Sequence, residues 1–215
     1  MTLKIGYLQS SLILFGLFLI VVTAQIRSKI FHPVLFWTVV LATSTAGTTL
    51  SDFMDRTLGL GYAKGSVILV SGLLLILGIW RLSEKSLSVA NIYSTKAQLF
   101  YWTAVLFSNT LGTALGDYLA DSSGLGFLGG ALLIGGLLSL VLLIYYFTQF
   151  NRITLFWIAF VLTRPFGATF GDLMTKPLSK GGLNFGTIGS SAVLVVLLIG
   201  FVYFTPSGDT ESQQK

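Results

Sequence analysis

The chain has 215 residues, of which 53% are hydrophobic and 10% are charged, whereas soluble domains carry about 25% charged residues. This composition excludes an ordinary soluble domain, and the absence of cysteine with a single histidine excludes disulfides, thiolate metal sites and zinc sites built from histidines. The net charge of +5 is spread along the chain, so it does not form the basic patch that nucleic-acid binding requires.

Seven apolar segments follow one another along the chain, each close to the roughly 20 residues that cross a bilayer. They cover residues 7–25, 33–51, 65–81, 98–116, 125–147, 153–171 and 185–204. They predict an all-α, polytopic membrane protein with seven transmembrane spans. The first segment has an alternative interpretation as a secretory signal, because residues 22–24 resemble a cleavage site. The internal repeat favours a retained span.

Three of these segments share one pattern of residues. A tryptophan is followed by a glycine ten residues later and by an aspartate fifteen residues later, and this occurs at Trp37, Gly47 and Asp52, at Trp102, Gly112 and Asp117, and at Trp157, Gly167 and Asp172. A related link after each aspartate leads into a second apolar segment. The unit is therefore a helical hairpin, predicted at residues 31–95, 96–150 and 151–206. Two spans in each unit keep the repeats parallel, around an axis along the membrane normal.

The first 30 residues correspond to half of such a unit, because residues 2–7 align with residues 57–62. Either the protein has seven spans, or its start codon was assigned too late. In the second case, the DNA upstream should encode about 35–60 further residues, enough for one span and its flanks. We expect residues 1–206 to form a single transmembrane domain. Residues 207–215 are polar and predict a disordered cytoplasmic tail.

The tandem hairpins, each with a tryptophan and a Gly-Asp or Ser-Asp pair, resemble an uncharacterised family of bacterial membrane-anchored proteins built from two-helix repeats of unknown function. Residues 163–168, with Gly171 and Asp172 after them, are close to the family pattern. The resemblance covers essentially the whole chain and implies a location in the bacterial inner membrane. It also implies four hairpins, whose first helix carries a Gly-Glu-Thr motif and an acid that are absent here. It implies no established activity.

The charges in the links predict an orientation. Seven basic residues lie in the links after the first, third and fifth spans and in the tail, against five on the other side. This positive-inside bias places the C-terminus in the cytoplasm. Trp37, Trp102 and Trp157 then lie near the inner interface, where we expect them to act as interface anchors.

A polar stripe runs along the first helix of each hairpin, because positions 7, 11, 14 and 15 after the tryptophan share one helical face. Besides the aspartates, it contains Ser44, Thr48, Asn109, Thr113 and Arg164. We expect it to face the bundle interior, since lipid would leave these polar groups unsatisfied. The glycines predict close helix packing, as in other motifs with small residues four apart. They are Gly47, Gly112, Gly116, Gly167 and Gly171.

The three aspartates have two interpretations. Each lies near a helix C-terminus, where the helix dipole disfavours a carboxylate unless something compensates it. Each could cap a short following turn. Alternatively, Asp52, Asp117 and Asp172 converge near one axis and form a cation site. The sequence leaves both open, and it shows no firm metal site and no cofactor motif.

Arg164 lies near the middle of its span, where an arginine costs at least about 3 kcal/mol unless it is paired or reached by water. Its counterparts are the neutral Ser44 and Asn109. It is either one half of an ion pair between repeats or a counter-ion for a substrate.

These features give three hypotheses about function. The first is a transporter of a small solute or ion, including a metal cation, with the aspartates and Arg164 along its pathway. The second is a membrane scaffold or partner subunit that does not transport. An intramembrane enzyme ranks third, because no pair of nucleophile and base is visible. The expected partners are the lipid bilayer, a small ion or solute and, as an open alternative, a second copy of the chain.

Overall fold

Seven helices make up the computed structural model of the chain, which describes residues 6–28, 30, 32–89, 92 and 94–204. They are α1 (Tyr7–Arg27), α2 (Pro33–Asp52), α3 (Gly61–Glu84), α4 (Thr95–Asp117), α5 (Gly126–Phe147), α6 (Arg152–Thr175) and α7 (Gly186–Phe204). Each coincides with one predicted apolar segment, and the described residues contain no β-strand. The all-α, polytopic membrane fold is therefore confirmed. The predicted tail at 207–215 lies outside the described residues.

Five of the helices are long and apolar enough to cross a membrane, namely α1, α2 with the turn after it, α3, α5 and α6. The described apolar part of α7, Gly186–Leu197, is shorter. The helix α4 is long but less apolar, because its middle carries Ser108, Asn109 and Thr110, all of them buried. Its polar groups thus face other helices and need not meet lipid.

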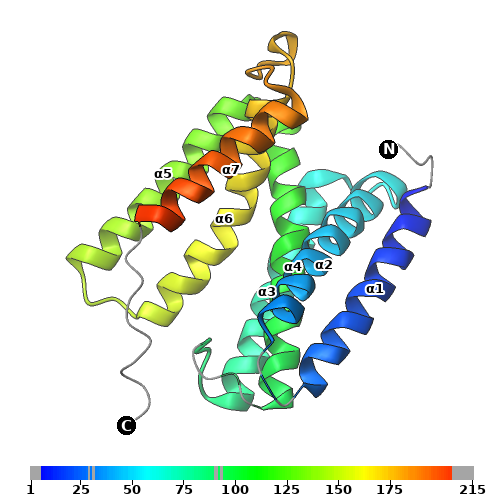
Figure 1. Cartoon of the computed structure of the whole chain (residues 1–215), viewed down its shortest axis with the longest axis vertical. Helices are drawn as coiled ribbons and strands as arrows, with labels where there is room; N and C mark the ends of the chain where they lie inside the picture. The colour runs from blue at the N-terminus through cyan, green and yellow to red at the C-terminus, as the bar shows by residue number, and fades with distance from the viewer. Residues whose placement is uncertain (1–5, 29, 31, 90–91, 93, 205–215) are drawn as a thin grey trace. The chain divides into compact units, whose positions relative to one another are not determined.

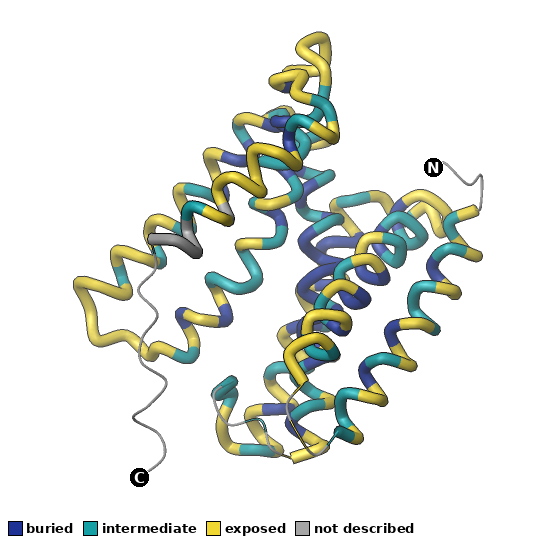
Figure 2. The backbone as a smooth tube through the Cα atoms, in the orientation of Figure 1, coloured by how far each residue is buried: buried dark blue, intermediate teal, exposed yellow. Residues whose placement is uncertain are grey.

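The chain divides into two units, the first ending at Phe170 and the second beginning at Gly171. In the first unit, α4 lies between α2 and α3, and α1 packs against α2. About half of the residues of α4 are buried, and Figure 2 shows buried positions concentrated along this helix. The outward sides of α1, α3 and α5 expose leucine and isoleucine side chains, as a lipid-facing surface requires.

The direction of the helices follows the repeat. Figure 1 shows that α2, α4 and the first-unit part of α6 run one way and that α1, α3 and α5 return. The amino ends of α2, α4 and α6 therefore share one end of the first unit. The carboxyl ends of α2 and α4 lie at the other end. This is the parallel arrangement expected for hairpin repeats.

A π-helical turn follows the aspartate in the first two repeats, at Phe53–Thr57 and at Tyr118–Ser122. Each turn leads into a link in which two glycines take the left-handed conformation, Gly59 with Gly61 and Gly124 with Gly126. Only glycine adopts this conformation without steric cost. The first two repeats, which share the spacing between the aspartate and these glycines, therefore have the same backbone path at this link.

The second unit has its own connection between α6 and α7. The backbone amides of Leu183 and Phe185 donate to the carbonyls of Leu173 and Met174, at 2.6 and 3.0 Å. These bonds satisfy carbonyl groups at the end of α6 that the helix itself leaves without a partner. A side chain on Gly182 would collide with the carbonyl of Lys176, so only glycine fits there. The longer link of the third repeat is thereby fastened to α6.

Candidate functional site

An arginine joins carboxylates from two successive repeats at the carboxyl ends of α2 and α4. Arg56 Nε lies 3.1 Å from Asp52 Oδ1, and Arg56 Nη2 lies 3.5 Å from Asp117 Oδ2. The guanidinium offsets the unfavourable interaction between these carboxylates and the negative ends of their helix dipoles. Two of the three aspartates expected to converge therefore do so, and an arginine lies between them.

The π-helical turn positions Arg56. Arg56 follows Asp52 by four residues, and it lies beside Asp52 because the turn continues the helical path past that aspartate. Arg56 Nη1 also donates to the hydroxyl of Tyr7 at 3.2 Å, and the guanidinium lies 5.8 Å from the centre of that ring. Arg56 thus connects α1 and the first two repeats.

A third carboxylate in this region, that of Asp55, is buried. Asp55 is 7% exposed, and its Oδ2 accepts a hydrogen bond from Ser51 Oγ at 3.2 Å. Its Oδ1 has no hydrogen-bond partner among the described residues and lies against Gly65, where a larger residue would collide with it. A buried carboxylate oxygen without a partner favours binding of a proton or cation. We call Asp52, Asp55, Arg56 and Asp117 the carboxylate cluster.

Asp172 belongs to the second unit. Its Oδ1 lies 3.6 Å from Lys176 Nζ, four residues later, in the same relation that Asp52 has to Arg56. No group of three or more acidic, histidine or cysteine side chains that could hold a metal ion is present in the described part of the chain. Asp52, Asp117 and Asp172 each have a basic partner, and the hypothesis that they form one metal site stays a prediction.

Arg164 occupies the middle of α6 and packs against α4. A side chain on Gly112 would collide with the Cβ of Arg164, so the two helices touch at this point. The guanidinium lies 5.6 Å from the centre of the Phe160 ring, one turn back along α6. Asp52 and Asp117 pair with Arg56, and the described residues give Arg164 no carboxylate partner.

Two of the remaining polar residues of the stripe lie beside each other, one on α2 and one on α4. The hydroxyls of Thr48 and Thr113 lie 3.4 Å apart, which places the stripes of two repeats face to face. Asn109 is buried, and neither its amide nitrogen nor its amide oxygen has a hydrogen-bond partner among the described residues. Ser44, at the equivalent position of α2, is half-buried. Thr48, by contrast, is exposed, so the stripe faces the bundle interior at Asn109 but not along its whole length.

Three of the glycines make the close helix contacts expected of them. A Cβ on Gly47 would lie 2.8 Å from the Cβ of Asn109, and one on Gly116 would lie 2.6 Å from the Cβ of Ala168. Gly112 makes the contact with Arg164 described above. Gly167 has no atom of the described chain within 4 Å of such a position. Gly171, in the second unit, accepts a hydrogen bond from the hydroxyl of Thr175 at its carbonyl.

The three tryptophans differ in burial, and their role as interface anchors stays a prediction. Trp102 and Trp157 are buried inside the bundle, and the indole nitrogen of Trp157 donates to the carbonyl of Leu87 at 3.1 Å. Neighbouring helices cover these rings, so two of the three serve packing between repeats. Trp37 alone among them is exposed, with 63% of its surface accessible.

A cavity of about 800 Å³ opens at the amino ends of α2, α4 and α6. The aromatic residue before each tryptophan lines it, namely Phe36, Tyr101 and Phe156, together with Gln25 and Arg27 of α1. The side-chain oxygen of Gln25 has no partner among the described residues. None of the lining residues is acidic, and helix amino ends carry partial positive charge. This end of the bundle therefore differs in electrostatic character from the carboxylate cluster.

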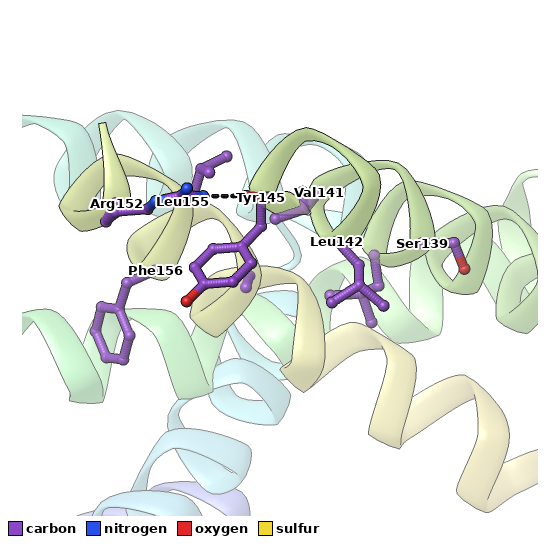
Figure 3. A pocket seen from close by; sticks show the side chains of 9 residues that line it. Ser139, Val141, Leu142, Tyr145, Arg152, Leu155 and Phe156 are labelled. Atoms are coloured by element: carbon purple, nitrogen blue, oxygen red, sulfur yellow. Dashed lines mark hydrogen bonds between the residues drawn. The ribbon is translucent and has the colours of Figure 1, made fainter. Parts of the chain in front are cut away.

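A second hollow, of about 490 Å³, lies between α5 and α6 (Figure 3). Its lining is apolar except for Ser139, Tyr145 and Arg152. Arg152 donates to the carbonyl of Tyr145, and its guanidinium lies 4.2 Å from the centre of the Tyr145 ring. The arginine thus satisfies the carboxyl end of α5, and the hollow offers little for recognition of a polar ligand.

The chain matches a known protein family. The family described as Repeat of Unknown Function (DUF347) matches residues 35–86, 100–151 and 155–205. The chain belongs to this family. The three matches fall on the helix pairs α2–α3, α4–α5 and α6–α7, which confirms the tandem repeats. No curated protein and no solved structure matches the chain.

Membership of this repeat family brings no activity with it, so the residues themselves must indicate the function. The sequence pattern predicted Asp52 and Asp117 as site residues. Arg56 was counted only among the basic residues that lie in the links between helices. The signal that would have found it is the spacing of four residues between Asp52 and Arg56, which is repeated between Asp172 and Lys176. In the second repeat, the equivalent residue is the acidic Asp121.

Proposed function

We propose that this protein transports a small ion, with a proton or metal cation as the first candidate, across the bacterial inner membrane. The observation that carries the proposal is the carboxylate cluster, in which Arg56 bridges Asp52 and Asp117 within a bundle of apolar helices. Ionisable side chains inside membrane proteins are costly, and they commonly mark ion pathways. A scaffold requires no such group.

The chemistry of the cluster fits exchange of one cation for another. Arg56 pairs with two carboxylates and offsets one of their two negative charges, and its side chain is 45% exposed, so it can move away into solvent. A cation that binds Asp52 and Asp117 would take over this compensating charge. Asp55, beside them, supplies a further carboxylate oxygen that has no partner among the described residues.

The rest of the first unit supplies the other parts of a pathway. The cavity at the amino ends of α2, α4 and α6 would admit the solute from the opposite end. Asn109 and Arg164 then lie between the two ends, on the polar stripe. With the C-terminus in the cytoplasm, the cavity faces the cytoplasm and the carboxylate cluster faces outward.

The proposal is tested with the purified full chain in sealed lipid vesicles that contain a trapped dye. The probes are protons, Na⁺ and Mn²⁺, each followed separately. We expect uptake of at least one probe, reduced about tenfold or more by Asp117→Asn, since an ionised carboxylate cannot be replaced by an amide in charge exchange. Asp121→Asn is the matched control, because Asp121 is an exposed acid of the same repeat. It should transport as the unchanged protein does.

Two results would overturn the proposal. One is the absence of uptake for all three probes, and the other is unchanged uptake by a folded Asp117→Asn protein. The second candidate function, a membrane scaffold or partner subunit, would then be favoured. It is supported by the ion-paired state of the cluster and by the close glycine contacts, which are also typical of a purely structural bundle.

A further inference from the structure

One carboxyl group of the carboxylate cluster lies apart from its ion pairs. Asp55 is buried, and one of its two oxygens, Oδ2, accepts a hydrogen bond from the hydroxyl of Ser51 at 3.2 Å. The other oxygen, Oδ1, is closed off from solvent and has no hydrogen-bond partner among the described residues. All these groups lie between residues 51 and 65, within the first unit. The surroundings of this carboxyl group are therefore local to one repeat.

The space around the unpartnered oxygen restricts what it can bind. Oδ1 of Asp55 lies against the backbone of Gly65 on α3, where even a Cβ would collide with it. A larger cation would require this oxygen to move away from Gly65. A proton needs no space of its own, so the oxygen can accept it where it lies.

The repeat shows that the fold does not need this carboxyl group. In the second repeat, Ala120 stands three residues after the repeated aspartate, and Gly116 stands one residue before it. The third repeat has Thr175 and Gly171 at these two positions. The π-helical turn and its glycine link nevertheless form in the second repeat as they do in the first. The buried carboxyl group and the serine that donates to it are thus an addition found in one repeat.

Charge balance disfavours a third ionised carboxylate in the cluster. Asp52 and Asp117 share the single positive charge of Arg56, which leaves one net negative charge before Asp55 is counted. The charged groups that act on Asp55 are Asp52, which repels a negative charge there, and Arg56, which attracts it. The attraction of Arg56 is thus already divided between two other carboxylates.

The helices packed against this turn do not supply a second positive charge. The described parts of α1, α2 and α3 contact the turn, and no further basic side chain in them acts on Asp55. Tyr7 of α1 and Tyr62 of α3 both interact with Arg56. Burial disfavours the charged form of a carboxyl group that lacks a compensating partner. The neutral form of Asp55 avoids this cost.

We propose that Asp55 binds a proton while Arg56 pairs with Asp52 and Asp117, and that it releases this proton when a cation takes the place of Arg56. On release, the O–H bond breaks, the electron pair stays on the carboxylate and the proton passes to water. The displaced guanidinium, on the next residue, then compensates the new negative charge. A monovalent cation that enters as one proton leaves keeps the total charge of the cluster unchanged. The exchange rests on the proposed transport function, whereas the bound proton does not.

Infrared spectroscopy of the full chain in lipid membranes tests the bound proton. A neutral carboxyl group has a carbonyl stretching band at a frequency where an ionised carboxylate and an amide have none. We expect Asp55→Asn, which keeps the size of the side chain, to lose this band, and the band of the unchanged protein to shift in D₂O. Asp121→Asn removes an exposed acid and is the matched control, which should keep the band.

A second variant keeps the test valid if Asp55→Asn does not fold. Ser51→Ala retains the carboxyl group but removes the hydrogen bond to its Oδ2, so the band should move to another frequency without disappearing. A band that neither Asp55→Asn nor Ser51→Ala changes, or the absence of any such band, would overturn the proton site.

Proton release tests the exchange. Na⁺ and Mn²⁺ are added separately to the purified full chain in weak buffer with a pH-indicator dye, and the bound cation is measured in parallel. We expect release of about one proton for each cation bound, since one carboxyl group must ionise. Asp55→Asn should bind the cation without this release, and Asp121→Asn should release as the unchanged protein does.

The two measurements separate failure of this inference from failure of the proposed function. Cation binding without proton release would overturn the exchange and leave ion transport standing. A protein that has the infrared band but binds neither cation would contradict transport of these ions and overturn the exchange, while the proton site on Asp55 would be confirmed.

Discussion

At the scale of single residues, the carboxylate cluster shows how two like charges are held at adjacent helix ends. The carboxylates of Asp52 and Asp117 repel each other and also interact unfavourably with the negative ends of their helix dipoles. The positive charge of Arg56 offsets both repulsions. Only the spacing of four residues from Asp52 could have predicted the role of Arg56, because the repeated pattern runs from the tryptophan to the aspartate and does not include the arginine. Its contact with Asp117 joins residues 61 positions apart and required the structure.

Replacing Arg56 by methionine should destabilise the protein. The change leaves Asp52 and Asp117 without their compensating charge, and we expect a loss of about 1–3 kcal/mol, less than for a fully buried pair because Arg56 is partly exposed. Thermal unfolding in detergent measures it. Adding Asp117→Asn should recover part of the loss, whereas adding Asp121→Asn should not. An Arg56→Met protein as stable as the unchanged one would contradict this account.

Arg164 should behave differently from Arg56. Its described surroundings include Phe160, Tyr101 and the backbone of Gly112 but no carboxylate partner, so Arg164→Met removes no ion pair and keeps the apolar stem. We expect its unfolding temperature to stay close to that of the unchanged protein. Removing one partner of a buried ion pair typically costs about 3–5 kcal/mol, and a loss of that size would show that Arg164 is paired. If the pathway passes Arg164, the stable variant should still transport poorly.

At the scale of helices, apolar length was sufficient to predict all seven elements. The boundaries differ most for α3, predicted at 65–81 and observed at Gly61–Glu84, because a helix continues into flanking polar residues that carry no hydropathy signal. The π-helical turns have no such signal either. The predicted stripe did indicate which side of α4 faces inward, as the buried Asn109 shows.

The contact between α4 and α6 gives a prediction at this scale. Gly112→Ala should destabilise the protein by about 1–3 kcal/mol, because the added methyl group collides with the Cβ of Arg164, which is fixed to the backbone. Thermal unfolding again measures the change. Gly136→Ala is the control, since a methyl group there meets no described atom within 4 Å. Equal stability of the two variants would mean that α4 and α6 can separate without cost.

At the scale of the whole molecule, the repeat accounts for the order and the direction of the helices. The count of basic residues in the links predicts one orientation, in which the carboxyl ends of α1, α3 and α5 lie on the cytoplasmic side. The carboxylate cluster then faces outward, where it meets external cations first. The orientation therefore decides from which side a cation would displace Arg56.

Single cysteines in the otherwise cysteine-free chain test this orientation in intact cells. Ser122→Cys lies beyond α4, at the end that holds the carboxylate cluster, and Ser86→Cys lies beyond α3, at the opposite end; both positions are exposed. A membrane-impermeant maleimide should label Ser122→Cys from outside. Ser86→Cys should be labelled only after permeabilisation. The opposite labelling pattern would reverse the orientation, and the cavity at the amino ends of α2, α4 and α6 would then face outward.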